Sequence, residues 1–240
     1  MPDLRDRVAI VTGSTKGIGR AIAEALADAG AHVVVSARDA RAVEEAAAAV
    51  GRRGPGRALG VPCDVRDPAQ VRRLVGAAVE TFGRLDILVN NAGVGAFAPI
   101  DELPPEDWHR VIDTNLTGVY YCCREAVPHM KRQGAGWIVN IGSLAGRYTM
   151  ATGTAYNASK WGLLGFTEAL MLDVRDFGIR VSCVMPGSVD TYFRGTPPSG
   201  EEWKLRPEDV AKVVLQLLDH DPRSLPSKVE LRPARPPTKG

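Results

Sequence analysis

Short, almost wholly apolar runs alternate with amphipathic stretches along this chain of 240 residues. The first two runs span residues 8–12 and 32–36 and are rich in β-branched side chains. Between them, apolar residues recur at steps of three and four, the period of a helix with one buried face: Ile18, Ala21, Ile22, Ala25 and Leu26. Strands that are apolar throughout are buried on both faces, as in a parallel sheet covered by helices. The chain is therefore predicted to be an α/β protein.

The alternation continues to residue 231 without a linker that would divide the chain. Strands are expected at residues 8–12, 32–36, 58–62, 85–89, 137–141, 180–184 and 228–231. Helices are expected at residues 17–29, 39–50, 68–82, most of 105–133, 155–177 and 207–218. Asp39 and Asp67 stand where side chains cap helices. A chain of this length suits one domain. Residues 1–231 are predicted to form it, as a doubly wound parallel sheet of about seven strands, and residues 232–240 a flexible Pro-rich tail.

The composition excludes several classes of partner. The net charge is +2, from 30 basic and 28 acidic residues, so neither nucleic acid nor an anionic membrane is expected as a partner. No apolar run approaches the ~20 residues that span a bilayer, and residues 1–7 do not resemble a signal peptide. The cysteines lack metal-ligand spacing and are expected to be buried free thiols in a reducing compartment: Cys63, Cys122, Cys123 and Cys183. A cytoplasmic protein without a bound metal is the expectation.

A glycine-rich turn joins the first strand to the first helix. Its residues after Thr12 are Gly13, Ser14, Thr15, Lys16, Gly17, Ile18 and Gly19. Glycines let the backbone turn sharply and come close to phosphates, and the following helix offers free N–H groups and a positive dipole end. The turn predicts a pyrophosphate site of a dinucleotide. A tight turn built only for packing remains the alternative, because the spacing is G-x-x-x-G-x-G.

The end of the second strand indicates which dinucleotide is bound. An acid about twenty residues past the turn would hold the ribose hydroxyls of NAD, but this chain has Ser-Ala-Arg at 36–38. Arg38, together with Lys16 inside the turn, suits a 2′-phosphate. NADP(H) is therefore the predicted cofactor. The alternative is two exposed basic residues beside a helix start.

Later strand ends add candidate contacts to the same cofactor. Asp64 and Val65 could meet the adenine, although a strand-end turn or a cap would also explain Asp64. Small residues after the fourth strand would let the chain pass close to a ribose: Asn91, Ala92 and Gly93. After the sixth strand, free backbone groups could meet a carboxamide, with Thr191 just beyond: Pro186, Gly187 and Val189.

Tyr156 and Lys160 lie four residues apart in a predicted helix and so share one of its faces. A cation beside a phenol lowers the phenol's pKa from its usual value near 10. Ser143 lies thirteen residues before the tyrosine. The pair indicates a proton donor and acceptor tuned toward neutral pH, and with the glycine turn it predicts proton and hydride exchange at a carbonyl carbon.

These motifs together resemble the short-chain dehydrogenase/reductase family over about residues 5–231: TGSTKGIG at 12–19, NNAG at 90–93, Asn115, Ser143, YNASK at 156–160 and Pro-Gly at 186–187. The resemblance implies a Rossmann-type fold with strand order 3-2-1-4-5-6-7. It implies that Tyr156 is the acid/base, that Lys160 lowers the pKa of Tyr156 and binds ribose, and that Ser143 binds the substrate oxygen. It implies that Asn115 interrupts its helix and positions a relay water.

The expected substrate is a small ketone, aldehyde or alcohol, whose identity and preferred reaction direction the sequence leaves open. Residues 95–99, 144–154 and 189–203 should wall the pocket, with apolar side chains from Phe97, Tyr148, Met150, Tyr192 and Trp203. Arg147 and Arg194 could meet an anion, although loop arginines are mostly solvated. The segment after Val189 is shorter than in many family members, which predicts an open pocket.

Two alternatives to a carbonyl reductase remain. Members that resemble 3-oxoacyl-carrier-protein reductases close with Val-Asp-Gly-Gly, whereas residues 225–233 here read Leu-Pro-Ser-Lys-Val-Glu-Leu-Arg-Pro. That departure weakens a thioester reductase and puts the family's tetramer contact there in doubt. A non-catalytic NADP-binding redox sensor is the third hypothesis. A homodimer or homotetramer is expected, formed across the helical regions 105–133 and 155–177.

Overall fold

A single parallel sheet of seven strands runs through the molecule in the order β3-β2-β1-β4-β5-β6-β7. The computed structural model describes residues 2–193 and 197–235. The strands are β1 Val8–Thr12, β2 His32–Ser36, β3 Ala58–Gly60, β4 Ile87–Asn90, β5 Gly136–Ile141, β6 Ile179–Pro186 and β7 Lys228–Leu231. Every neighbouring pair in this sheet is parallel. The predicted fold class and strand order are confirmed.

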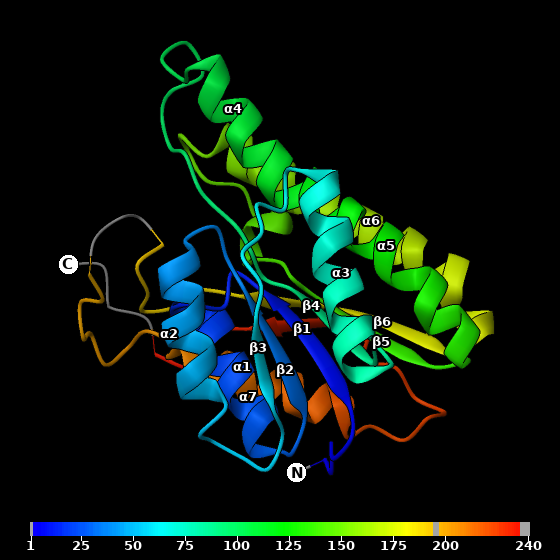
Figure 1. The fold of residues 1–240 in the computed structure, drawn as a ribbon. Coiled ribbons are helices and arrows are strands. Elements are labelled where there is room, and N and C mark those ends of the chain that lie inside the picture. Colours follow the sequence, from blue (N-terminus) through cyan, green and yellow to red (C-terminus); the bar gives the residue numbers. More distant parts are fainter. Residues whose placement is uncertain (1, 194–196, 236–240) are drawn as a thin grey trace.

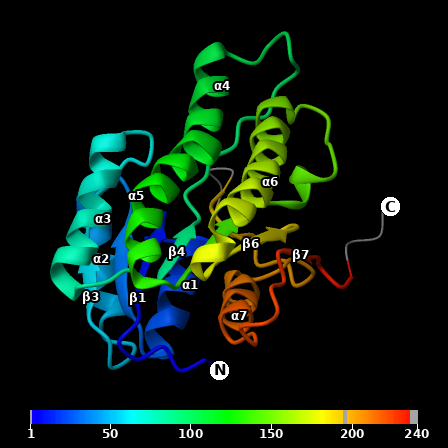
Figure 2. The ribbon, with the colours of Figure 1, turned by 90° about the vertical axis from the view of Figure 1, so that its right-hand side faces the viewer.

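Helices cover both faces of the sheet (Figures 1 and 2). They are α1 Gly17–Asp28, α2 Ala40–Val50, α3 Pro68–Phe82, α4 Pro105–Ile112, α5 Gly118–Gln133, α6 Thr154–Val174 and α7 Pro207–Leu218. Helices α1, α2 and α7 pack on one face, and α3, α5 and α6 on the other. None of the helices that the structure describes is both long and apolar enough to cross a membrane.

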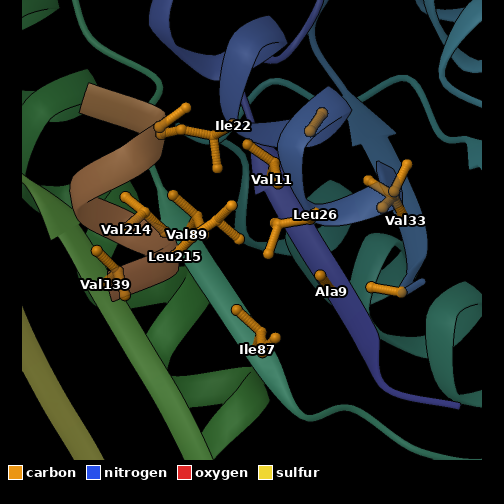
Figure 3. Packing of buried hydrophobic residues seen from close by; sticks show 14 of the residues in the cluster. Ala9, Val11, Ile22, Leu26, Val33, Ile87, Val89, Val139, Val214 and Leu215 are labelled. Atoms are coloured by element: carbon orange, nitrogen blue, oxygen red, sulfur yellow. The ribbon is translucent and has the colours of Figure 1, made fainter. Parts of the chain in front are cut away.

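Two separate cores explain why the strands are apolar throughout. Alternate residues of β2 point to opposite faces, so that Val33 and Val35 join the core under α1 and α7, whereas Val34 joins the core under α3, α5 and α6. Figure 3 shows the first of these cores, where Ile22 and Leu26 of α1 and Val214 and Leu215 of α7 meet the sheet. The four cysteines are buried free thiols, as predicted.

Local capping signals set several helix boundaries where the sequence places them. The Asp39 carboxylate accepts from Ala42 N–H at 2.9 Å and begins α2. The Asp67 carboxylate accepts from Ala69 N–H at 2.8 Å and begins α3. At the far end of α3, Gly83 ends the helix with a φ of 78°, a conformation that glycine adopts without strain.

Several element boundaries differ by one to three residues from the sequence prediction; β3, for example, ends at Gly60 rather than at residue 62, and β4 begins at Ile87 rather than at residue 85. Within the stretch 105–133, a π-helical turn over Asp113–Thr117 separates α4 from α5, at the interruption that the family resemblance implies for Asn115. The predicted helix 155–177 ends as α-helix at Val174, and Arg175–Phe177 form a tighter 3₁₀ turn. Strand β6 extends to Pro186, because its last four residues pair with β7.

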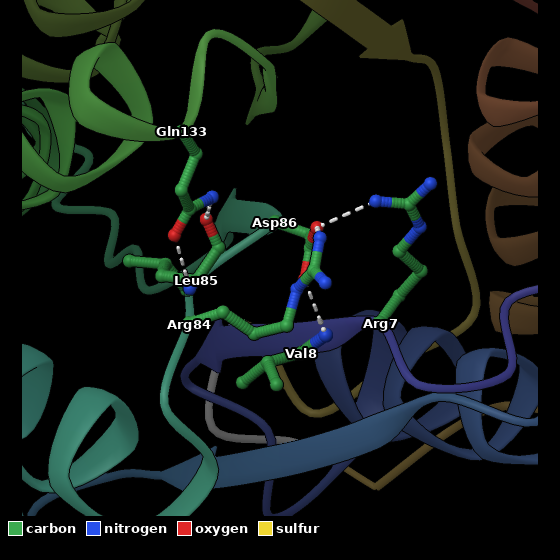
Figure 4. A network of polar contacts seen from close by, with 6 residues as sticks. All are labelled: Arg7, Val8, Arg84, Leu85, Asp86 and Gln133. Atoms are coloured by element: carbon green, nitrogen blue, oxygen red, sulfur yellow. Dashed lines mark hydrogen bonds and ion pairs between the residues drawn. The ribbon is translucent and has the colours of Figure 1, made fainter.

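A buried carboxylate ties the amino ends of β1 and β4 together (Figure 4). Asp86 accepts hydrogen bonds from the side chains of Arg7 and Arg84 and from Val8 N–H at 2.9 Å. Burial raises the pKa of Asp86, but these hydrogen bonds outweigh burial and hold the pKa below its usual range. Next to it, Gln133 and Leu85 exchange two hydrogen bonds, which fix the end of α5 to the same edge. This edge is opposite the one that carries the candidate site.

Candidate active site

A cleft of about 980 Å³ lies at the carboxyl ends of the strands and gathers most of the predicted site residues. Its lining includes Gly13, Thr15, Lys16, Gly17, Ile18, Arg38, Asp64, Val65, Asn91, Ala92, Gly93, Ser143, Tyr156, Lys160, Pro186, Gly187, Val189 and Thr191. Three predicted residues lie behind this lining instead: Ser14, Gly19 and Asn115. Segments from both ends of the chain therefore meet in one hollow, as parallel strand ends do in doubly wound sheets.

The glycine turn combines close approach with close packing. Gly13 and Gly17 have φ values of 64° and 57°, in the region that glycine favours. Gly19 serves packing, because a Cβ there would lie 2.3 Å from Asn91 Nδ2 and 2.4 Å from Gly13 O. The same Asn91 amide donates to Gly13 O at 3.0 Å. The packing alternative thus describes Gly19 and applies in part to Gly13, where a Cβ would lie 2.9 Å from Ala92 Cα, while Gly17 has room around it.

Ser14 holds the two first strand ends together rather than facing the cleft. Its Oγ donates to Val11 O at 2.6 Å and accepts from Ser36 N–H at 2.9 Å. The side chain is fully buried. Ser14 therefore shapes the turn that its neighbours present to the cleft.

Two exposed cations, Lys16 and Arg38, lie at the end of the cleft beside the first two strands. Lys16 and Arg38 both line it, and neither forms an ion pair within residues 2–193 and 197–235. The Lys16 ammonium lies 5.2 Å from the centre of the Tyr192 ring. The Asp39 carboxylate next to Arg38 accepts from Ala42 N–H as the cap of α2. This end of the cleft suits an anion.

Asp64 is held by its own neighbour. Its carboxylate pairs with the Arg66 guanidinium at 2.6 Å and accepts from Arg66 N–H at 3.0 Å. Hydrogen bonds from Arg66 lower the pKa of Asp64, and Arg38 adds to the effect. This arrangement is the strand-end turn that the sequence left open, although Asp64 still lines the cleft.

Tyr156 and Lys160 lie on the same face of α6 and line the cleft together, as their spacing predicts. The Lys160 ammonium is 5.8 Å from the centre of the Tyr156 ring and donates to Ile141 O at 2.9 Å. Lys160 is only 6% exposed, and burial lowers its pKa to about 8, with Cys183 acting weakly in the opposite direction. The ammonium is thus anchored to β5, and its pKa is closer to neutral pH than that of an ordinary lysine.

Asn115 lies in the π-helical turn, where the helix is interrupted. Its Oδ1 accepts from Val94 N–H at 2.8 Å, and its Nδ2 donates to Val94 O at 2.8 Å and to Ser159 Oγ at 3.0 Å. Both amide hydrogens are therefore used inside the protein. Gly93 lies between Asn115 and Lys160, because a Cβ at residue 93 would be 3.4 Å from Asn115 Oδ1 and 3.8 Å from Lys160 Nζ.

Ser143 follows β5 and begins a 3₁₀ turn over Leu144–Gly146. Its Oγ accepts from Ala145 N–H at 3.1 Å. That bond uses an acceptor position, so the hydroxyl hydrogen remains available for a second partner in the cleft. The same residue can thus cap its turn and donate to a bound oxygen.

Two buried asparagines, which the sequence did not single out, hold the elements of the site in place. Asn157 donates to Ala145 O at 2.7 Å and to Tyr148 O at 3.1 Å, which ties α6 to the segment after Ser143. Asn140, on β5, donates to Thr167 Oγ1 on α6 at 2.9 Å and accepts from Asn90 at 2.8 Å. A polar residue inside an otherwise apolar strand was the available signal for Asn140.

The predicted wall of the substrate side is partly confirmed. Phe97, Met150, Tyr192 and Trp203 line the cleft, whereas Tyr148 does not. The Arg147 guanidinium lies outside the lining and pairs with Glu230 at 2.7 Å. It therefore does not face the cleft, where it could have met an anionic substrate. Arg194 lies outside the described residues.

The first residues of the predicted tail contribute to the cleft. Arg232 and Pro233 both line it. The Arg232 guanidinium pairs with Glu230 at 2.9 Å and lies 4.7 Å from the centre of the Tyr148 ring. The predicted tail is therefore held against the rest of the protein at its first residues, Arg232 and Pro233. Residues 236–240 lie outside the described part of the chain.

Comparison with known proteins gives consistent results. The family model for short chain dehydrogenases matches residues 7–201. An uncharacterized oxidoreductase of Staphylococcus saprophyticus is 35% identical over 97% of this chain and 100% of its own length. Another, of Methylorubrum extorquens, is 38% identical over 95% of this chain and 97% of its own length.

Solved structures agree in fold. An alcohol dehydrogenase from the archaeon Thermococcus sibiricus, complexed with 5-hydroxy-NADP, superposes with a TM-score of 0.90 at 30% identity, covering 96% of this chain and 99% of that one. A metagenomic short-chain oxidoreductase in complex with NADP superposes with a TM-score of 0.86 at 35% identity, covering 98% of this chain and 100% of that one. The family match over most of the chain, together with these relatives, shows that the chain belongs to the short-chain dehydrogenase/reductase family of oxidoreductases.

Proposed function

We propose that this chain is an NADP(H)-dependent oxidoreductase that interconverts a ketone or aldehyde and the corresponding alcohol. The observation that carries the proposal is that Tyr156 and the buried ammonium of Lys160 line the same cleft as the glycine turn. A nicotinamide dinucleotide, when bound, supplies or accepts the hydride. The proposal places cofactor and chemistry in a single unit formed by residues 1–231.

The residues of the cleft fit such a cofactor. Gly13 and Gly17 line the cleft at the amino end of α1, where a helix favours phosphate. Lys16 and Arg38 offer two unpaired cations beside that turn, which suits a 2′-phosphate and underlies the proposed preference for NADP(H). Asn91, Ala92, Gly93, Pro186, Gly187, Val189 and Thr191 complete the proposed contacts.

Proton transfer is assigned to this chain's own side chains. Tyr156 gives its phenolic proton to the substrate oxygen in reduction and takes it back in oxidation. Lys160 stabilises the phenolate through its positive charge and keeps two N–H groups free of Ile141 for ribose hydroxyls. Ser143 donates its hydroxyl hydrogen to the substrate oxygen, which stabilises the negative charge that develops there.

Asn115 acts from behind the cleft in this proposal. Because its two amide hydrogens are bound to Val94 O and Ser159 Oγ, it holds the strand-end segment and α6 in register beside Lys160. A relay water would then meet backbone groups of the π-helical turn, where α-helical bonding is interrupted.

Replacement of the tyrosine tests the assignment. Tyr156→Phe should lower kcat at least about a thousandfold, because it removes the proton donor, while the Kd for NADPH changes less than about twofold. Tyr120→Phe, on the exposed side of α5, is the matched control and should turn over normally. Turnover of Tyr156→Phe near the wild-type rate with aldehydes, diketones or ketoacyl esters would contradict the mechanism.

A reductase for carrier-bound 3-oxoacyl thioesters is the less favoured alternative. The Arg147 guanidinium, a cation that could have met an anionic carrier, is engaged by Glu230 away from the cleft. Turnover of acetoacetyl thioesters in preference to simple ketones would favour that alternative. A redox sensor without catalysis would instead bind NADPH tightly and turn over none of the carbonyl compounds.

A further inference from the structure

Three aromatic rings meet at the catalytic end of the cleft. The Phe193 ring centre lies 5.3 Å from that of Tyr156, and the Phe97 ring centre lies 5.6 Å from it. Phe97 and Phe193 meet edge to face at 6.5 Å. These distances and tilts are those that aromatic pairs prefer. The phenol that is proposed to deliver the proton is thus bordered by two rings.

A glycine makes room for this arrangement. A Cβ added at Gly95 would lie 2.7 Å from one ring atom of Phe97 and 3.0 Å from one of Phe193. The rings of Phe97 and Phe193 therefore both pack against the backbone at residue 95, where a side chain would clash with them. Phe193 is 40% exposed, so its outer side faces solvent while its inner side contacts Tyr156.

Two cations that line this side of the cleft are paired with carboxylates. Lys204 pairs with Glu201, and Arg232 pairs with Glu230. Met150 and Trp203 add further apolar lining. Apart from the Lys160 ammonium, which lies 5.8 Å from the centre of the Tyr156 ring, the described wall residues next to Tyr156 thus favour a flat and apolar partner.

We propose that the position against Tyr156, Phe97 and Gly95, now held by the Phe193 side chain, is a subsite for a planar unsaturated ring of the substrate. The substrate class is then an aryl or ring-conjugated ketone or the matching alcohol, and Phe97 is its specificity-determining residue. This inference rests on the proposed function. Phe193 stands in for the substrate's ring and gives way when that ring binds.

The test compares two ketones with the same carbon skeleton, 1-phenylethanone and 1-cyclohexylethanone, which differ in the flatness and π-character of the ring. Conjugation also lowers the reactivity of the aryl ketone, so binding is measured beside turnover. Calorimetry on NADPH-loaded Tyr156→Phe, which has the ring but no proton donor, should give a Kd for the aryl ketone about tenfold lower than for the cyclohexyl ketone. Equal Kd values would overturn the inference.

Substitutions locate the preference. Phe97→Leu, added to Tyr156→Phe, should abolish the aryl preference and leave the Kd of the cyclohexyl ketone within about twofold, because leucine keeps the apolar contact without the ring. Phe193→Ala should retain the preference and lower both Kd values, because the competing ring is gone. Phe177→Leu, remote on its 3₁₀ turn, is the matched control and should change nothing.

The outcomes separate this inference from the proposed function. Wild-type turnover of the cyclohexyl ketone without any aryl preference in binding supports the function and rejects the ring subsite. Absence of turnover with every carbonyl compound rejects the function, while aryl-selective binding that depends on Phe97 still supports the subsite. An aryl preference that survives Phe97→Leu unchanged shows that the ring binds elsewhere and overturns the assignment.

Discussion

The ammonium of Lys160 is anchored to the carbonyl oxygen of Ile141, at 2.9 Å, in a setting that is almost closed to solvent. Burial brings its pKa from 10.5 to about 8. Each pKa unit corresponds to about 1.4 kcal/mol, so holding this charge inside the fold costs about 3 kcal/mol at neutral pH. The buried Lys160 ammonium therefore lowers the free energy of unfolding, while it places a positive charge beside Tyr156.

Lys160→Met should consequently abolish turnover without destabilising the fold at pH 7. Loss of the buried charge offsets the cost of leaving the Ile141 carbonyl without its donor, about 1–3 kcal/mol. Urea unfolding of the cofactor-free protein should give a free energy of unfolding at least equal to that of the wild type. Leu163→Ala, one turn further along α6, is the contrast and should lose about 2–5 kcal/mol.

The pH dependence of this comparison has a definite sign. Between pH 8 and 10.5 the unfolded state of the wild type binds more protons at Lys160 than the folded state does. Wild-type stability from this group therefore rises with pH in that window, whereas the methionine variant gains nothing there. The stability of Lys160→Met relative to the wild type should fall by up to about 3 kcal/mol. A constant difference across the window would contradict the buried charge.

Asp86 makes the opposite prediction at the other edge of the sheet (Figure 4). Its folded pKa is lowered by its hydrogen bonds, so its contribution is present above the unfolded pKa near 3.9 and is lost as pH falls through the folded value. Asp86→Asn should lower the free energy of unfolding at pH 7 by about 1–3 kcal/mol. The difference in free energy of unfolding between Asp86→Asn and the wild type should become smaller in acid, because Asp86 is then protonated in the wild type as well.

The control for Asp86 is an exposed carboxylate with a similar partner. Asp221 pairs with Arg223 at 3.0 Å, and both side chains are more than half exposed. Asp221→Asn should leave the free energy of unfolding close to that of the wild type at any pH, because exposed ion pairs contribute little. If the two variants behave alike, the buried contacts of Asp86 do not stabilise the sheet edge.

The contrast between these sites explains what the sequence could predict. Strands and caps depend on nearby residues, so the cap of α3 at Asp67 and the shared face of Tyr156 and Lys160 followed from spacing alone. The partner of Arg147 did not, because Glu230 lies 83 residues further along the chain. The same holds for Phe193, which the fold brings against Tyr156 from a loop.

The helical interruption at Asn115 is an intermediate case. Nothing in the local residue pattern predicts a π-helical turn, and only the resemblance to the family implied it. The structure shows why it forms there: the Asn115 amide is held on both sides by Val94 and by Ser159. Long-range hydrogen bonds of this kind outweigh local helix propensity.

Lys16 and Arg38, the two cations proposed to meet a 2′-phosphate, predict how cofactor choice will respond to substitution. Arg38→Ala and Lys16→Ala should each raise the Kd for NADPH about tenfold or more, since each removes a charge-assisted contact to the 2′-phosphate. The Kd for NADH should change less than about twofold. Fluorescence titration of both cofactors checks this, with Arg41→Ala as the control because that guanidinium is paired with Glu45.

A clear wild-type preference for NADH would contradict this assignment. So would an equal loss of affinity for both cofactors in Arg38→Ala, because a residue that meets only the 2′-phosphate does not affect NADH. Raising the ionic strength should weaken NADPH binding more than NADH binding, since the contact is exposed and screened by salt.

Exposed apolar side chains on α5 and α6 predict self-association. Tyr120, Trp161 and Leu172 are 45%, 49% and 55% exposed, and their helices lie side by side on one face of the sheet (Figure 2). We expect a homodimer or homotetramer that buries this face, because large apolar groups gathered on one surface mark interaction sites. Leu172→Glu should shift the protein to monomers in light scattering, as a charge buried at the interface would be costly. Phe177→Glu, on the adjoining 3₁₀ turn, controls for added charge. A wild type that is monomeric at micromolar concentration would contradict the association.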